Sequence, residues 1–266
     1  MRTQQKMLKN NSLLRGGQLL SLAGAGFALA ALAAIAGALS GFGTRWGWWP
    51  FPVGFTILKW AACAGLAAAL VSLAAAVVTR RQGCLRRGVV LSAAGIIIGL
   101  VVAGVPWSWM HKAEKLPRIH DISTDTENPP RFQSVLALRK NAPNSAEYEG
   151  AKIASQQRAA YPDIMPLLLA VPQAPAFDRA LETSRNMGWM IVDANTREGR
   201  IEATDTTFWF GFKDDVVVRV TAAPGGSRVD VRSESRVGLS DIGANAARIR
   251  SFLRKLAHAG RCRELQ

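Results

Sequence analysis

The stretch GGQLLSLAGAGFALAALAAIAGALSGFG, residues 16–43, contains no ionisable side chain and no polar stripe. A second apolar stretch covers residues 54–78, with Lys59 as its one charged residue, and a third covers residues 88–109. A bilayer core of roughly 30 Å needs about 20 helical residues, so each stretch is long enough to cross it. The sequence therefore predicts a membrane domain, residues 1–110, with three transmembrane helices at about 17–41, 55–78 and 88–109.

Acidic residues are missing from this half of the chain. The first 110 residues contain ten Lys or Arg and no Asp or Glu, so they carry ten of the fourteen net positive charges. The bases cluster before the first apolar stretch and between the second and third: Arg2, Lys6, Lys9, Arg15, Arg80, Arg81, Arg86 and Arg87. The loop between the first two stretches holds essentially Arg45 alone. The excess charge thus indicates orientation, and nucleic acid is excluded as a partner.

Loops rich in Lys and Arg stay on the cytoplasmic side of a membrane. We therefore expect a multi-pass protein of the bacterial inner membrane with a cytoplasmic N-terminus. Everything after the third helix then lies on the periplasmic side. The expected partners are the lipid bilayer and a membrane or envelope protein, with anionic lipid as a further candidate.

Small residues recur four apart in the apolar stretches, as with Gly95 and Gly99. This spacing lets helices approach closely in lipid. It favours packing among the chain's own three helices over association of two copies. No acid or His lies in mid-membrane, which argues against a pump or secondary transporter.

The last ninety or so residues alternate between helical and strand patterns. Helices are predicted from Pro175 to Met187 and from Ser240 or Asp241 to Gly260. Between them, four strands are predicted at residues 189–194, 200–207, 216–222 and 228–237. The pattern predicts an α+β core over residues 175–260: a helix, a four-stranded antiparallel sheet and a helix. Residues 111–174 are interpreted as a connector and an extended segment, in which prolines permit at most an edge strand.

Four segments carry a resemblance to a known family: IHDISTD (119–125), FGFKDDVVVRV (210–220), VDVRSESRVG (229–238) and SDIGANA (240–246). They resemble the domain-of-unknown-function 1499 family, over roughly residues 112–258. The resemblance implies an envelope-associated domain that often follows membrane helices. It implies no activity, cofactor or catalytic residue.

Three arginines form the first candidate site. Arg232 and Arg236 share one face of the last predicted strand, and Arg219 lies on the strand before it. Clustered guanidinium groups bind phosphate or carboxylate in a bidentate manner. The alternative is a ladder of cross-strand ion pairs on a solvated face.

His120 and Asp121 form the second candidate site. A His with nearby acids can serve acid–base chemistry, and Asp125 and Asp205 are further candidate acids. Neighbouring side chains of an extended chain point to opposite faces, however, so His120 and Asp121 cannot form a dyad directly. The alternative is a loop tied down by local hydrogen bonds. The adjacent Asp214 and Asp215 are interpreted as turn residues that pair with Arg or Lys.

These patterns favour a membrane protein whose exported domain binds a partner protein or an amphiphilic or anionic envelope ligand. The alternative function is an envelope enzyme, hydrolase-like, that acts on lipid or glycan through His120 and nearby acids. The three cysteines, Cys63, Cys84 and Cys262, have no metal-ligand spacing. The sequence therefore predicts no metal and no cofactor.

Overall fold

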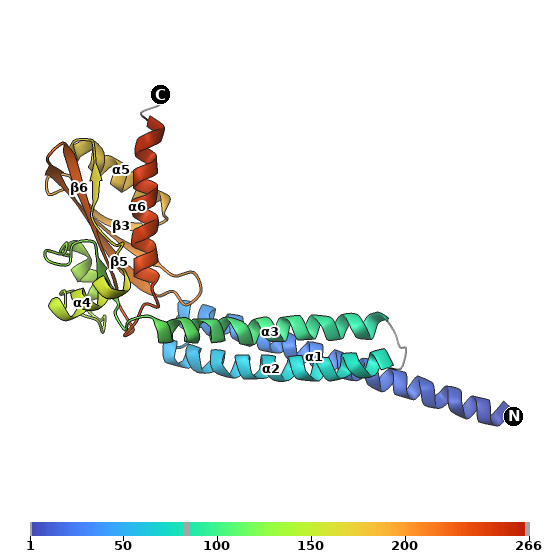
Figure 1. Ribbon diagram of the computed structural model, residues 1–266. Coiled ribbons are helices and arrows are strands. Elements are labelled where there is room, and N and C mark those ends of the chain that lie inside the picture. Colours follow the sequence, from blue (N-terminus) through green and yellow to red (C-terminus); the bar gives the residue numbers. More distant parts are fainter. Residues whose placement is uncertain (1, 82–85, 264–266) are drawn as a thin grey trace. The chain divides into compact units, whose positions relative to one another are not determined.

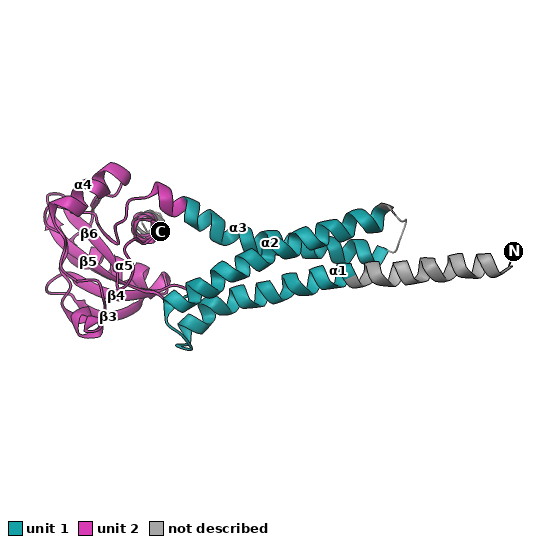
Figure 2. Ribbon diagram, turned by 90° about the horizontal axis from the view of Figure 1, so that it is seen from below, with its two compact units in different colours: residues 1–111, 209–211 teal, residues 112–208, 212–266 magenta. Residues whose placement is uncertain are grey.

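A computed structural model describes the backbone of residues 2–81 and 86–263. The chain divides into two compact units (Figure 2). The first unit comprises residues 1–111 together with residues 209–211, and the second comprises residues 112–208 and 212–266. Each unit is described by itself.

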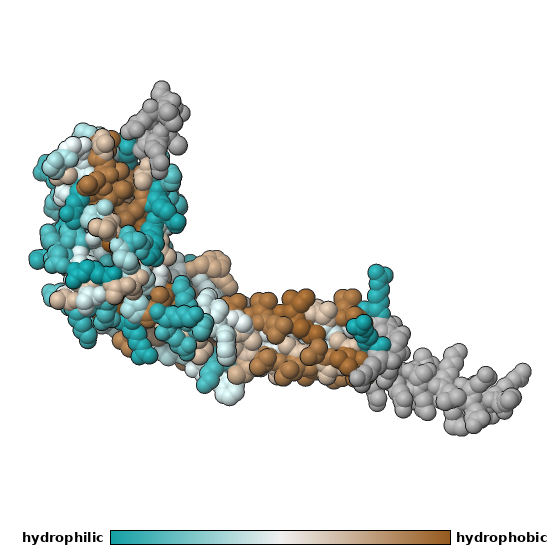
Figure 3. Space-filling model, in the orientation of Figure 1, coloured by the Kyte–Doolittle hydropathy of each residue, from teal (hydrophilic) through white to brown (hydrophobic). Residues whose placement is uncertain are grey.

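The first unit is built from three long helices (Figure 1). These are α1 (Arg2–Arg45), α2 (Phe51–Arg81) and α3 (Arg86–Lys115). Segments Leu22–Arg45, Phe51–Arg80 and Arg86–Lys115 are long and apolar enough to cross a membrane. Figure 3 shows hydrophobic side chains along these helices. Cys84 lies outside the described residues, as does the side chain of Cys262.

Glycines let the three helices approach one another closely. A Cβ atom built on Gly26 of α1 or on Gly95 of α3 would collide with Ser72 of α2. A Cβ on Gly99 would collide with the carbonyl oxygen of Gly65. Gly95 and Gly99 therefore face helices of the same chain, as the sequence favours, because only a residue without a side chain fits these crossings.

The second unit is a mixed domain built on one antiparallel sheet. Its strands are β1 (Asp121–Ser123), β2 (Leu167–Leu169), β3 (Met190–Asn195), β4 (Arg200–Thr206), β5 (Lys213–Ala223) and β6 (Gly226–Ser235). The strand order is β1-β6-β5-β4-β3, and β2 also pairs with β6. β5 and β6 form a hairpin whose paired residues extend from Asp214 and Ser235 to Ala223 and Gly226.

The prediction of four strands was wrong, because the sheet has six. The two additional strands, β1 and β2, have three residues each. Three residues are too few to show the alternation by which a strand is recognised from sequence. β2 lies in the segment predicted to be extended, and it pairs with β6 at residues 227–229.

One face of the sheet, the helix face, carries the apolar core. Helices α5 (Gln173–Asn186) and α6 (Ala244–Arg263) pack there (Figure 1). The core contains alternate strand residues and helix residues that are all buried: Ile201, Ala203, Val216, Val218, Val220, Val229, Val231, Phe177, Ile249, Phe252 and Leu256. Period-two alternation in the strands and a 3.6-residue period in the helices bring these side chains together.

Helix α6 begins at Ala244, three residues after the predicted cap Asp241, because Ile242 and Gly243 have positive φ, and it ends later than predicted. The Asp241 carboxylate accepts hydrogen bonds from the backbone N–H of Gly243 and of Asn245, at 2.8 and 2.6 Å. Gly260 was predicted to stop the helix, but α6 continues to Arg263. A glycine weakens a helix by about 1 kcal/mol, and this does not oblige the helix to end.

The opposite face of the sheet, the polar face, is covered by residues 124–150. This segment contains a 3₁₀ helix, η1 (Ser134–Arg139), and it precedes α4 (Ala151–Ala160). Phe132 and Val135 pack on Val217 of β5 and form a small second core. The remaining strand residues on this face are largely charged, and they make up the candidate site.

Candidate functional site

The polar face is a buried layer of charged side chains. Strand alternation places these residues on one side of the sheet: Arg200, Glu202, Thr204, Asp215, Arg219, Asp230, Arg232, Glu234 and Asp121. Glu202, Asp215 and Glu234 are completely buried, and Arg232 is 2% exposed. Charged groups this deep are stable only when each is paired and hydrogen-bonded.

Arg232 is held by two acids, Asp121 from the neighbouring strand β1 and Glu234 from its own strand β6. Its guanidinium donates to both carboxylate oxygens of Asp121, at 2.9 and 2.8 Å, and to Glu234 at 3.3 Å. It also donates to the carbonyl oxygens of Pro130 and Ala146 in the covering segment. The Nε and Nη2 groups of Arg232 are therefore bound within the domain, and Nη1 makes one long contact, at 3.4 Å, to the carbonyl oxygen of Pro130.

Arg139 of η1 joins the covering segment to the sheet. Its two terminal nitrogens donate to Asp215 and to Glu234, each at 2.8 Å. Arg236 donates to both oxygens of Asp215, at 2.9 and 2.8 Å, in a bidentate pair. Three arginines and three acids thus form one continuous network between the sheet and its cover.

Glu202 fixes the start of η1. One carboxylate oxygen accepts from the backbone N–H of Gln133 and Ser134, and the other accepts from Val135 at 2.9 Å. Arg200 pairs with the same carboxylate. The first N–H groups of a helix have no partner within the helix, and Glu202 supplies one from the sheet.

Burial shifts the pKa of the acids in this network. Burial, together with the negative charge of Asp121, raises the pKa of Glu234 to about 8. The positive charges of Arg139 and Arg232 oppose this rise. The pKa of Asp121 is also raised by burial, although Arg232 opposes the shift. Burial acts on Asp215 too, yet hydrogen bonds from Arg236, Thr204 and Arg139 hold its pKa below the ordinary value.

The three predicted arginines lie on the polar face but do not meet as one open cluster. Arg219 pairs with Asp125 and Asp230, at 3.2 and 3.0 Å, while Arg232 and Arg236 belong to the network above. The interpretation of a solvated face was wrong, because residues 124–150 cover these charges. The cross-strand ion pairs themselves are present.

The predicted His120 site is dispersed. The Nε2 atom of His120 lies 3.8 Å from a carboxylate oxygen of Glu149, whereas the carboxylate of Asp121 pairs with Arg232 on the polar face. Asp205 pairs with Arg248 of α6 on the helix face. Asp214 and Asp215 are buried residues of β5 that pair with arginines and are not turn residues.

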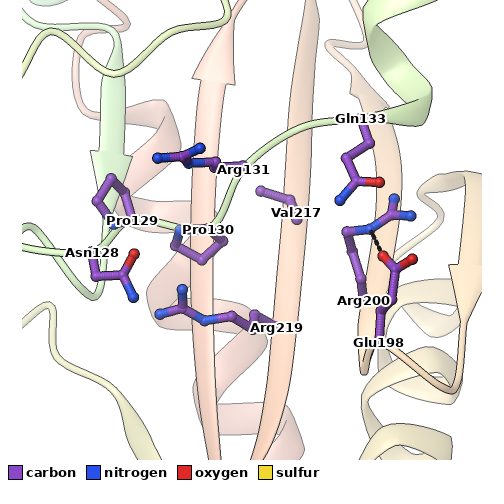
Figure 4. Close-up of a pocket in the computed structure, with 9 residues that line it drawn as sticks. All are labelled: Asn128, Pro129, Pro130, Arg131, Gln133, Glu198, Arg200, Val217 and Arg219. Carbon is purple, nitrogen blue, oxygen red and sulfur yellow. Dashed lines mark hydrogen bonds and ion pairs between the residues drawn. The ribbon is translucent and has the colours of Figure 1, made fainter.

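A small pocket of about 220 Å³ opens beside Arg219 (Figure 4). It is lined by Asn128, Pro129, Pro130, Arg131, Gln133, Glu198, Arg200, Val217 and Arg219. Arg200 pairs there with Glu198 at 3.0 Å, and Arg219 is already bound to its acids. Among the described residues, Arg131 has no hydrogen bond or ion pair, and its side chain is exposed.

A larger pocket of about 470 Å³ shares Asn128, Pro129 and Arg131 with the small one. Its remaining lining residues are Glu127, Phe132, Leu136, Ala146, Glu147, Tyr148 and Arg232. The Arg232 guanidinium stacks on the rings of Phe132 and Tyr148, at 4.8 and 5.4 Å from their centres. Cation–π contacts of this kind hold the two rings, and so the pocket wall, in place.

Sequence reasoning missed Arg131, Arg139 and Glu202. The sequence does contain a signal for Arg139, because this residue ends an apolar-rich stretch. A single charge in such a stretch needs a buried partner of opposite charge. Glu202 alternates with apolar residues along its strand, and this pattern predicts that its side chain faces solvent. Arg131 lies in an irregular segment after two prolines, where no periodicity indicates its environment. No group of three or more potential metal ligands occurs among the residues that the structure describes.

Comparison with known proteins places the chain in a family. The family model described as "Protein of unknown function (DUF1499)" matches residues 121–256. The match begins at β1 and ends within α6, so it contains the whole sheet and both of its covers. No curated protein and no solved structure matches the chain. The chain belongs to the DUF1499 family of proteins of unknown function.

Proposed function

We propose that this protein is a membrane-anchored binding protein that recognises an anionic ligand through Arg131 and the small pocket of the polar face. In this proposal α1, α2 and α3 span the bacterial inner membrane with the N-terminus in the cytoplasm. The second unit then lies on the periplasmic side. The basic clusters beside α1 and between α2 and α3 support this orientation.

The unpaired guanidinium of Arg131 carries the proposal. Arg200 and Arg219 share its pocket, and acids within the domain already neutralise both. Arg131 is therefore the group that gains most from an external anion. A phosphate or carboxylate matches the planar fork of its N–H groups in a bidentate pair.

An enzymatic role has less support. Acid–base catalysis needs a titratable group and a partner within hydrogen-bonding reach of one substrate atom. His120 and Asp121 have separate partners, and neither lines either of the two pockets described above. A binding role requires no such convergence.

The test is titration calorimetry of the full-length protein in a non-ionic detergent with ethyl phosphate and with inorganic phosphate. Arg131→Ala should weaken binding roughly ten- to a hundredfold, because a hydrogen bond to a charged group contributes about 1.5–3 kcal/mol. Binding should also weaken as salt rises. Dihexanoyl phosphatidic acid, run in parallel, distinguishes a lipid headgroup from a free phosphate.

The matched control is Arg254→Ala, which removes an exposed arginine from α6 on the other side of the sheet. Its affinity should equal that of the unmodified protein. Equal losses in both variants would mean that only overall charge attracts the anion. That result, or no binding of any of these anions by the unmodified protein, would overturn the proposal.

A further inference from the structure

We infer that the ligand is zwitterionic, with its anionic group at Arg131 and an ammonium group in the larger pocket beside it. This inference rests on the proposed function, because it extends the ligand from Arg131 into the neighbouring space. The two pockets share Asn128, Pro129 and Arg131, so they are neighbours, and Arg131 lines the larger pocket as well as the small one.

An unpaired carboxylate points to the ammonium group. Glu147 lines the larger pocket and is exposed, and among the described residues its carboxylate has no hydrogen bond or ion pair. Glu127 lines the same pocket, and its carboxylate binds Arg158 at 2.7 Å near the solvent. An ionised carboxylate only accepts hydrogen bonds, so the ligand group beside these two must donate.

The charges of the other groups in the pocket agree with this assignment. Arg232 also lines the pocket, but Asp121 binds its guanidinium in a bidentate pair, and the rings of Phe132 and Tyr148 contact it. One positive charge at Arg131 and one negative charge at Glu147 therefore remain uncompensated. No ion pair joins them. A second anionic group in the larger pocket would meet the unpaired carboxylate of Glu147 and be repelled, whereas an ammonium would be attracted.

The size of the pocket sets the class of ligand. About 470 Å³ lies within the range of small-molecule sites, and the stacked wall of Phe132, Arg232 and Tyr148 is already formed. A small molecule that carries both a phosphate and an amine, such as phosphoethanolamine, matches the signs of the two unpaired charges that line this pocket. The same chemistry occurs in a free amino-phosphate and in a lipid headgroup.

The experiment compares O-phosphoethanolamine with ethyl phosphate on the full-length protein in non-ionic detergent by titration calorimetry. Ethyl phosphate keeps the phosphate and the two carbons but lacks the ammonium. We expect phosphoethanolamine to bind about twofold to fivefold more tightly, because a solvent-accessible ion pair contributes up to about 1 kcal/mol. Glu147→Gln should abolish this preference and leave the affinity for ethyl phosphate unchanged or slightly higher.

The matched control is Asp178→Asn, which removes one exposed carboxylate from α5 on the helix face and should keep the preference. Dihexanoyl phosphatidylethanolamine distinguishes the sources: tighter binding than phosphoethanolamine supports a lipid ligand, and equal binding supports the free amino-phosphate. If ethyl phosphate binds as well as phosphoethanolamine, the zwitterion is wrong while the anion site stands. If neither ligand binds, the proposed function fails with it.

Discussion

At the scale of single residues, the domain depends on buried charged groups that share partners in one network. Arg232 and Asp121 are each 2% exposed and form a bidentate pair, so removing either side chain leaves the other buried without its partner. Breaking such a pair costs about 3–5 kcal/mol, although a well-packed apolar replacement of the whole group need not be destabilising. The network therefore explains why the covering segment docks in one way, through Arg139, more than it explains total stability.

The raised pKa of Glu234 predicts a pH-dependent stability. A glutamate has an ordinary pKa of 4.5, and the pKa of Glu234 is about 8 in the folded domain, so the folded state binds more protons between these values. The stabilising contribution of this group is full below about pH 4.5 and is lost as the pH rises through 8. The raised pKa of Asp121 acts in the same direction, whereas the lowered pKa of Asp215 affects stability only in acid.

Glu234→Gln should therefore flatten the decline in stability between pH 5 and pH 8, by on the order of 1 kcal/mol per pH unit at most. Pulse proteolysis of the full-length protein in urea measures the unfolding midpoint of the domain at each pH. Asp178→Asn serves as the control and should keep the decline. An unchanged decline in Glu234→Gln would assign the pH dependence to other groups.

At the scale of elements, one strand residue positions the segment that forms both pockets. Glu202 of β4 accepts three backbone N–H groups at the start of η1, and this contact lies between Arg131 and Arg139 in the chain. The covering segment has few apolar anchors of its own, since its buried core consists of Phe132 and Val135 on Val217. The docking of this segment therefore depends mainly on its polar contacts to the sheet.

Glu202→Ala should loosen this segment selectively, because it leaves three N–H groups without their acceptor, each at a cost of about 1–3 kcal/mol when buried. Hydrogen exchange of the amides at residues 133–135 should accelerate at least tenfold, while α5 and α6 keep their protection. Glu198→Ala, which removes an exposed acid two residues before Arg200, is the control. Equal acceleration across the sheet would mean that Glu202 supports the whole fold instead.

At the scale of the whole molecule, two units of different surface chemistry share one chain. The three helices expose large apolar side chains such as Leu32, Trp60 and Ile97, and they are long and apolar enough to cross a membrane. Their crossings need Gly26, Gly95 and Gly99 because the helix backbones nearly touch. The second unit has its own apolar core, which lies on the helix face of its sheet.

The proposed orientation predicts the behaviour of fusion proteins. Alkaline phosphatase fused after Gln266 should be active, because the enzyme needs disulfides that form in the periplasm. A fluorescent reporter that matures only in the cytoplasm should be dark at the same position. The reverse pair of results would invert the membrane topology and place the polar face in the cytoplasm.

Part of this protein follows from sequence alone. The sequence predicts the three apolar helices, the family, and the order of the later helices and strands. Each of these has a local signal in the length, charge or periodicity of a segment. The four strands that were expected occur where alternation is long enough to read, and β1 and β2 were missed because three residues carry no period. The alternation of Asp230, Arg232, Glu234 and Arg236 likewise predicted a charged face.

Only the tertiary structure decided what that face does. It placed Asp121 beside Arg232 and Arg139 between Asp215 and Glu234, across sequence separations of roughly a hundred residues that no local pattern reports. It also buried these charges under residues 124–150 and left Arg131 and Glu147 unpaired at the pockets. Periodicity determines which way a side chain points from its own strand, whereas its partners depend on which distant segment covers that strand.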